Sequence, residues 1–125
     1  MNSQTICIIE DSKPIRRLFC TILEKSGFST VDFEDAKTSI EWIKNNQADL
    51  IILDILLPDM NGTELLNQIR KVEGYASVPV IAITGFATAN DKDKYLAQGF
   101  DAYMPKPVNT ATFVQDVKAI LNSTK

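Results

Sequence analysis

Five segments of the chain carry the apolar patterns that predict β-strands. The runs at 6–9, 50–53 and 80–83 are almost entirely aliphatic, which is typical of strands covered on both faces. Residues 28–33 alternate apolar and polar side chains, which predicts an edge strand with one exposed face. A short fifth strand is expected at 102–104.

Between these segments, apolar residues recur at the three- and four-residue spacing of amphipathic helices. The first helix is expected to start after Asp11 or Ser12, either of which can act as N-cap, and to end at Gly27. The second runs from Ala36 to about Asn46. The remaining helices are expected at about 65–72, ending near Gly74, at 90–98 and at 113–121.

Strict alternation of strands and helices predicts an α/β fold, a doubly wound five-stranded parallel sheet with five helices and right-handed crossovers. The exposed second strand and the buried first, third and fourth strands favour the flavodoxin-like order 2-1-3-4-5. No linker or repeat interrupts the pattern, so residues 1–125 are expected to form a single domain. This order places the ends of strands one and three side by side.

Composition narrows the functional classes. With 13 basic and 16 acidic residues the net charge is −3, and nothing points to a nucleic-acid or membrane-surface binder. The absence of a signal-like leader or a membrane-spanning run predicts a cytoplasmic protein. The chain has no histidine, which excludes His-dependent triads and typical zinc sites.

Carboxylates follow two of the strands that this order makes neighbours. Glu10 and Asp11 follow the first strand, and Asp54 follows the third, with Pro58 and Gly62 in the loop beyond. In open α/β sheets, this edge is where ligands bind. Three ionised carboxylates would repel one another, so either their pKa values rise or a hard cation such as Mg²⁺ binds between them.

The fourth and fifth strands add a hydroxyl and an ammonium group. Thr84, followed by Gly85, ends the fourth strand, and Lys106, between two prolines, follows the fifth. A cation, an ammonium group and a hydroxyl around one carboxylate suit phosphoryl transfer, in which positioning and charge neutralisation dominate. A carboxylate such as Asp54 can itself be the nucleophile and form an aspartyl phosphate.

Taken singly, most of these residues have a structural explanation. Asp11 serves equally well as a helix N-cap, and Lys106 as a solvated loop charge. Thr84 fits an ordinary strand position, and Tyr103 fits a half-buried packing residue with its hydroxyl at the surface. Their joint occurrence, in order and on the right elements, favours the functional interpretation over these separate explanations.

In these residues the chain resembles the receiver domain of two-component response regulators, of the single-domain, chemotaxis-regulator type. The resemblance covers essentially the whole chain. It is carried by the acidic pair Glu10-Asp11, the phosphoacceptor position Asp54, the loop residues Pro58 and Gly62, the switch positions Thr84 and Tyr103, and Lys106-Pro107.

The resemblance implies a Mg²⁺ site. Asp11, Asp54 and the main-chain carbonyl of Leu56 would bind the ion directly, and Glu10 would act mainly through water. Asp54 would accept a phosphoryl group from a phosphohistidine on a partner protein. Lys106 and Thr84 would assist that transfer as catalytic residues.

The resemblance also implies a switch and two kinds of partner. Thr84 and Tyr103 would respond to phosphorylation and change the face formed by the fourth helix, fifth strand and fifth helix, where a downstream protein would bind. A histidine kinase or phosphotransfer protein would supply the phosphoryl group. The contact candidates for this donor are Lys13, Pro14, Arg17, Pro107 and Val108.

Two further details follow from the resemblance. The Lys106-Pro107 bond is expected to be cis. Leu56 and Phe86 would flank the path of the hydrolytic water, and because both are apolar, slow self-dephosphorylation is predicted. The domain would act in signalling and would not be a turnover enzyme.

Several alternatives remain at this point. A phosphatase of the haloacid-dehalogenase type needs a second Asp where this chain has Leu56. A flavin or dinucleotide carrier needs a glycine-rich loop after the first strand, which is missing. A non-phosphorylated scaffold, or a receiver excised from a hybrid histidine kinase, is harder to separate from the main reading. Met1 and the polar tail at 122–125 favour a complete protein over an excised domain.

Overall fold

The strands form one parallel sheet in the computed structural model, which describes residues 4–85 and 89–123. The strand order is β2-β1-β3-β4-β5, and every neighbouring pair is parallel, as predicted. The strands are β1 (Thr5–Ile9), β2 (Ser29–Phe33), β3 (Leu50–Asp54), β4 (Val80–Thr84) and β5 (Ala102–Pro105).

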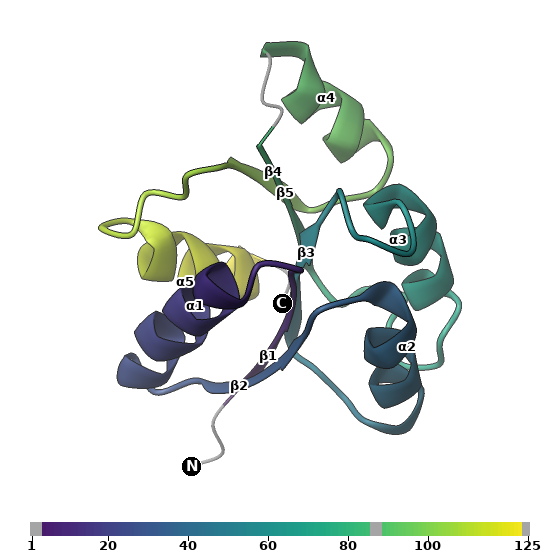
Figure 1. Cartoon of the computed structure of the whole chain (residues 1–125), viewed down its shortest axis with the longest axis horizontal. Coiled ribbons are helices and arrows are strands. Elements are labelled where there is room, and N and C mark those ends of the chain that lie inside the picture. Colours follow the sequence, from purple (N-terminus) through teal and green to yellow (C-terminus); the bar gives the residue numbers. More distant parts are fainter. Residues whose placement is uncertain (1–3, 86–88, 124–125) are drawn as a thin grey trace.

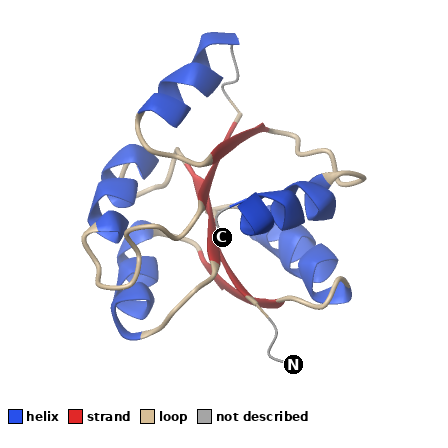
Figure 2. Ribbon diagram, turned by 180° about the vertical axis from the view of Figure 1, so that it is seen from behind, coloured by secondary structure: helices blue, strands red, loops and turns tan. Residues whose placement is uncertain are grey.

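Helices cover both faces of the sheet. Helices α1 and α5 lie on one side, and α2, α3 and α4 lie on the other (Figures 1 and 2). Their bounds are α1 (Lys13–Lys25), α2 (Ala36–Asn45), α3 (Gly62–Arg70), α4 (Ala89–Ala97) and α5 (Phe113–Ser123). None of the helices in the described part of the chain is long and apolar enough to cross a membrane.

Two apolar cores follow from the alternation of side chains along the strands. In β1, Cys7 and Ile9 pack with α2 and α3, whereas Ile6 and Ile8 pack with α1 and α5. Every residue of β3 and β4 is buried, which explains their uninterrupted apolar sequences. The central strands are therefore held from both sides, and their carboxyl ends are rigid supports for a site.

Local sequence sets the start of α1. The Oγ atom of Ser12 accepts a hydrogen bond from the Ile15 amide at 3.5 Å, and Pro14 occupies the first turn, where its missing N–H is no loss. Ser12, and not Asp11, is therefore the N-cap. The Asp11 side chain is left exposed at the carboxyl edge of the sheet.

The end of α3 differs from the prediction. The helix stops at Arg70, and the Val72 amide bonds to the Ile69 carbonyl in a turn at 3.0 Å. Gly74 follows at a φ of +92°, a conformation that favours glycine. The apolar period continued through Val72 because that side chain packs on the core from the turn.

Candidate functional site

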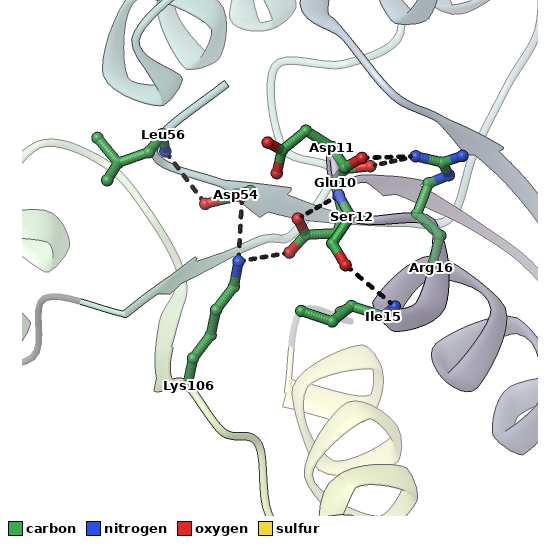
Figure 3. Close-up of polar contacts among 8 residues, drawn as sticks. All are labelled: Glu10, Asp11, Ser12, Ile15, Arg16, Asp54, Leu56 and Lys106. Carbon is green, nitrogen blue, oxygen red and sulfur yellow. Dashed lines mark hydrogen bonds and ion pairs between the residues drawn. The ribbon is translucent and has the colours of Figure 1, made fainter. Parts of the chain in front are cut away.

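Three carboxyl groups meet at the carboxyl edge of the sheet. Glu10 and Asp11 directly follow β1, and Asp54 is the last residue of its neighbour β3. One carboxylate oxygen from each lies within 4.8 Å of the other two (Figure 3). A set of hard oxygen donors at this spacing fits a divalent cation such as Mg²⁺, which takes carboxylate ligands and keeps several waters.

Lys106 is the cation of this edge. Its Nζ lies 2.7 Å from Glu10 Oε1 and 3.2 Å from Asp54 Oδ2 (Figure 3). Its amide donates to the Thr84 carbonyl at 2.9 Å, which continues the β4–β5 pairing beyond β5 and fixes where the side chain starts. The Lys106-Pro107 peptide is cis, as the resemblance implied. Lys106 is therefore not a solvated loop charge.

Burial and proximity divide the charge unevenly among these groups. Burial, followed by a hydrogen bond with Asp11, raises the pKa of Glu10 to about 7. The hydrogen bond with Glu10 lowers the pKa of Asp11. Partial burial works against the Lys106 ammonium, but its contacts with Glu10 and Asp54 outweigh this and raise the pKa of Lys106. The repulsion among the carboxylates is thus relieved by a proton on Glu10 and by the ammonium.

The loop after β3 folds back on Asp54. The Leu56 amide donates to Asp54 Oδ1 at 3.1 Å, and the Gly62 amide donates to the Ile55 carbonyl at 2.7 Å. A Cβ atom at Gly62 would lie 2.7 Å from the Ile55 Cα and 3.0 Å from the Asp54 carbonyl oxygen. Only glycine allows this approach, so Gly62 holds the loop that carries Leu56 against the acidic cluster.

The two switch candidates lie beside this cluster in different environments. Thr84 ends β4 and is buried. The Tyr103 ring stacks on Tyr95 of α4, with centroids 5.8 Å apart. The Tyr103 hydroxyl is buried and has no hydrogen-bond partner in the described part of the chain, so the expectation of a surface hydroxyl is wrong. The predicted role of Phe86 falls outside the described residues.

The sequence interpretation missed two residues that hold the loops of the site. The Arg16 guanidinium donates to the main-chain carbonyls of Glu10 and Asp11 (Figure 3). Asp59, in the loop after β3, accepts hydrogen bonds from the amides of Ala36 and Lys37 at 2.9 and 3.0 Å and so ties that loop to the start of α2. A basic residue in the first turn of a helix opposes the helix dipole, and this was the one available signal for Arg16.

Three carboxyl groups and a lysine at the carboxyl edge of a 2-1-3-4-5 parallel sheet define a receiver-type signalling domain. Residues 6–118 match the family model of the response regulator receiver domain, and the chain belongs to this family. The family works in two-component signalling. Its receivers bind Mg²⁺ at an acidic pocket and interact with histidine kinases or phosphotransfer proteins.

Individual relatives match over nearly the whole chain. The polar-differentiation response regulator DivK of Brucella ovis is 29% identical over 119 residues, which cover 95% of this chain and 97% of DivK. The crystal structure of a CheY-like receiver domain protein from Methanospirillum hungatei JF-1 is 32% identical, with a TM-score of 0.89 and coverage of 98% and 97%. A receiver domain of a histidine kinase from Syntrophus aciditrophicus is 28% identical, with a TM-score of 0.86 and coverage of 98% and 93%.

The raised pKa of Glu10 predicts how Glu10→Gln changes stability with pH in Mg²⁺-free buffer. Below the unfolded-state pKa of 4.5 the carboxyl is protonated in both states and contributes nothing. Between 4.5 and about 7 the unfolded chain loses the proton first, so this group lowers wild-type stability as the pH rises. We therefore expect Glu10→Gln to gain stability relative to the wild type from about pH 5 to about pH 8 in urea denaturation.

Glu41→Gln, at an exposed position of α2, is the control for the same chemical change away from the site. A difference between Glu10→Gln and the wild type that stays constant over this pH range would contradict the assigned proton on Glu10.

Proposed function

We propose that residues 1–125 form a phosphoacceptor receiver of a two-component or phosphorelay system, with Asp54 as the phosphorylated residue. The main support is the placement of Asp54 at the end of a fully buried strand, between Lys106 and the acidic pair. A buried carboxylate that already contacts an ammonium group is positioned for a nucleophilic role in phosphoryl transfer.

In the proposed reaction an Asp54 carboxylate oxygen attacks the phosphorus of a phosphohistidine on the partner. The new O–P bond forms as the N–P bond breaks, and its electron pair stays on the imidazole nitrogen. Lys106, now 3.2 Å from Asp54 Oδ2, is placed to pair with an oxygen of the incoming group. The Leu56 amide donates to Asp54 Oδ1 and leaves Oδ2 as the attacking oxygen.

The acidic cluster would hold Mg²⁺ through Asp11, Asp54 and the Leu56 carbonyl, with Glu10 acting through water. Bound Mg²⁺ would neutralise charge on the transferred phosphoryl oxygens. The Glu10 carboxyl, which pairs with Lys106, keeps that lysine directed at Asp54. This arrangement explains why the cluster keeps three acidic groups close together despite their repulsion.

Phosphorylation would be passed on by Thr84 and Tyr103. A phosphoryl group on Asp54 would draw the Thr84 hydroxyl toward it, and Tyr103 would move into the vacated space. The Tyr103 hydroxyl is buried without a partner, so a movement that pairs it is favourable. Because Tyr103 stacks on Tyr95, such a movement would change the α4–β5–α5 face, where we place the downstream protein target.

Asp54→Asn tests the phosphoacceptor. After incubation with acetyl phosphate and Mg²⁺, the intact mass of the wild type should rise by one phosphoryl group. Asp54→Asn should show no addition because an amide is not a nucleophile of this kind. Omission of Mg²⁺ with EDTA should abolish the addition to the wild type. An unmodified wild type under all of these conditions would favour the scaffold alternative.

Arg17→Glu tests the proposed docking of the phosphodonor on α1. Arg17 is exposed on the face of α1 that continues toward Lys106 through a groove lined by Ile15, Leu18 and Pro107. Charge reversal there should slow transfer from a phosphohistidine protein at least about tenfold, because close charge pairs steer such encounters. Phosphorylation by acetyl phosphate should stay unchanged. Lys25→Glu, at the far end of α1, is the matched control, and equal slowing by both variants would contradict the docking site.

Leu56→Asn tests the prediction of slow self-dephosphorylation. Leu56 is 49% exposed beside Asp54, and its side chain cannot orient a water by hydrogen bonding. The wild-type phosphoprotein should persist for minutes or longer in Mg²⁺, and Leu56→Asn should shorten its lifetime. Leu96→Asn, which changes an exposed leucine of α4, is the control. A wild-type lifetime of seconds, or no effect of Leu56→Asn, would contradict the prediction.

A further inference from the structure

We propose that Arg16 is a positioning residue for the metal site, because its guanidinium fixes the main chain from which Glu10 and Asp11 extend. This inference rests on the proposed Mg²⁺ site. Arg16 touches neither Asp54 nor either acidic side chain in the recorded contacts, so its action is through the backbone.

The guanidinium joins three points of the chain. Nη1 donates to the Glu10 carbonyl at 2.8 Å and to the Asp11 carbonyl at 3.2 Å. Nε donates to Asp32 Oδ2 on β2 at 3.0 Å, and the Arg16 side chain is only 12% exposed. The Glu10 amide is bonded to the Phe33 carbonyl at 3.0 Å. Both polar groups of Glu10 are therefore held, one by the sheet and one by Arg16.

The position of Arg16 in α1 explains its reach. Helical side chains point back toward the N-terminus, so a residue in the opening turn can cover the loop that precedes the helix. Figure 3 shows the Arg16 side chain lying against the segment that carries Glu10 and Asp11.

This placement is electrostatically unfavourable for a helix. The first turn of α1 contains Lys13 and Arg16 and no acidic residue, although the N-terminal end of a helix favours negative charge. A local rule that is broken in this way often marks a functional position. At Arg16 the compensation is the set of bonds to the two carbonyls and to Asp32.

A metal site needs this kind of support. Mg²⁺ demands near-octahedral geometry, so the backbone atoms that carry its ligands must be held in place. Residues that orient metal ligands without contacting the metal typically change metal affinity about 10- to 100-fold when they are replaced. Asp11 is exposed, with little packing to fix it, which leaves its main-chain carbonyl as the point of restraint.

The chain provides a matched control at the opposite edge of the sheet. Arg70 binds the main-chain carbonyls of Tyr75 and Val78 through Nη1, and Gly99 and Asp101 through Nη2. It therefore has the same chemistry as Arg16, two or more carbonyls and an aspartate, but it lies at the amino ends of β4 and β5. Arg16→Met and Arg70→Met both remove such contacts and keep an aliphatic stem.

The test measures Mg²⁺ binding by titration calorimetry on unphosphorylated protein, together with thermal melting. Arg16→Met should weaken Mg²⁺ binding at least about tenfold. Arg70→Met should lower the melting temperature but leave Mg²⁺ binding within about twofold of the wild type. At saturating Mg²⁺, the rate with acetyl phosphate should be within about twofold of wild type for Arg16→Met, since only the metal affinity is affected.

Two further variants separate position from charge. Arg16→Lys keeps the charge, but one ammonium cannot bridge both carbonyls and Asp32, so binding should stay about fivefold or more weaker than wild type. Asp32→Asn loosens only the far end of the guanidinium and should give a smaller loss, about threefold. It also keeps the test decisive if Arg16→Met does not fold.

Three results would overturn the inference: wild-type affinity in both Arg16→Met and Asp32→Asn, full rescue by Arg16→Lys, or an equal loss of affinity in Arg70→Met. Wild-type protein that binds no Mg²⁺ would instead overturn the proposed metal site, and this inference with it.

Discussion

The crowding of three carboxyl groups at one edge of the sheet is the constraint on which the rest of the site depends. Glu10, Asp11 and Asp54 come together because β1 and β3 are parallel neighbours. Their repulsion is relieved by Lys106, which contacts two of them, and by the raised pKa of the buried Glu10. A cation that displaces this proton would complete the balance, so metal binding and protonation compete at the same groups.

The fold meets this constraint with rigid supports. β3 is buried along its whole length, so Asp54 starts from a fixed position. On one side Arg16 holds the carbonyls of the acidic pair, and on the other Gly62 lets the loop after β3 approach the end of the strand. The strained electrostatics are thus confined to side chains, while the backbone around them is packed and hydrogen-bonded.

Apolar periodicity predicted the five strands, their order and the edge at which the acidic residues meet, because these features depend on burial that repeats along the chain. The end of α3 was misplaced because Val72 packs on the core from a turn, which periodicity cannot distinguish from a helix. The choice between Asp11 and Ser12 as N-cap, and the stacking of Tyr103 on Tyr95, depend on side-chain orientation. One-dimensional patterns carry no signal for such contacts.

The most direct test of the central claim is to locate the phosphoryl group. Protein treated with acetyl phosphate and Mg²⁺ is reduced with borohydride, which converts an aspartyl phosphate to homoserine, and its peptides are sequenced by mass spectrometry. The account predicts homoserine at position 54 and at no other aspartate. Homoserine elsewhere, or none at position 54 in a protein that has gained a phosphoryl group, would contradict it.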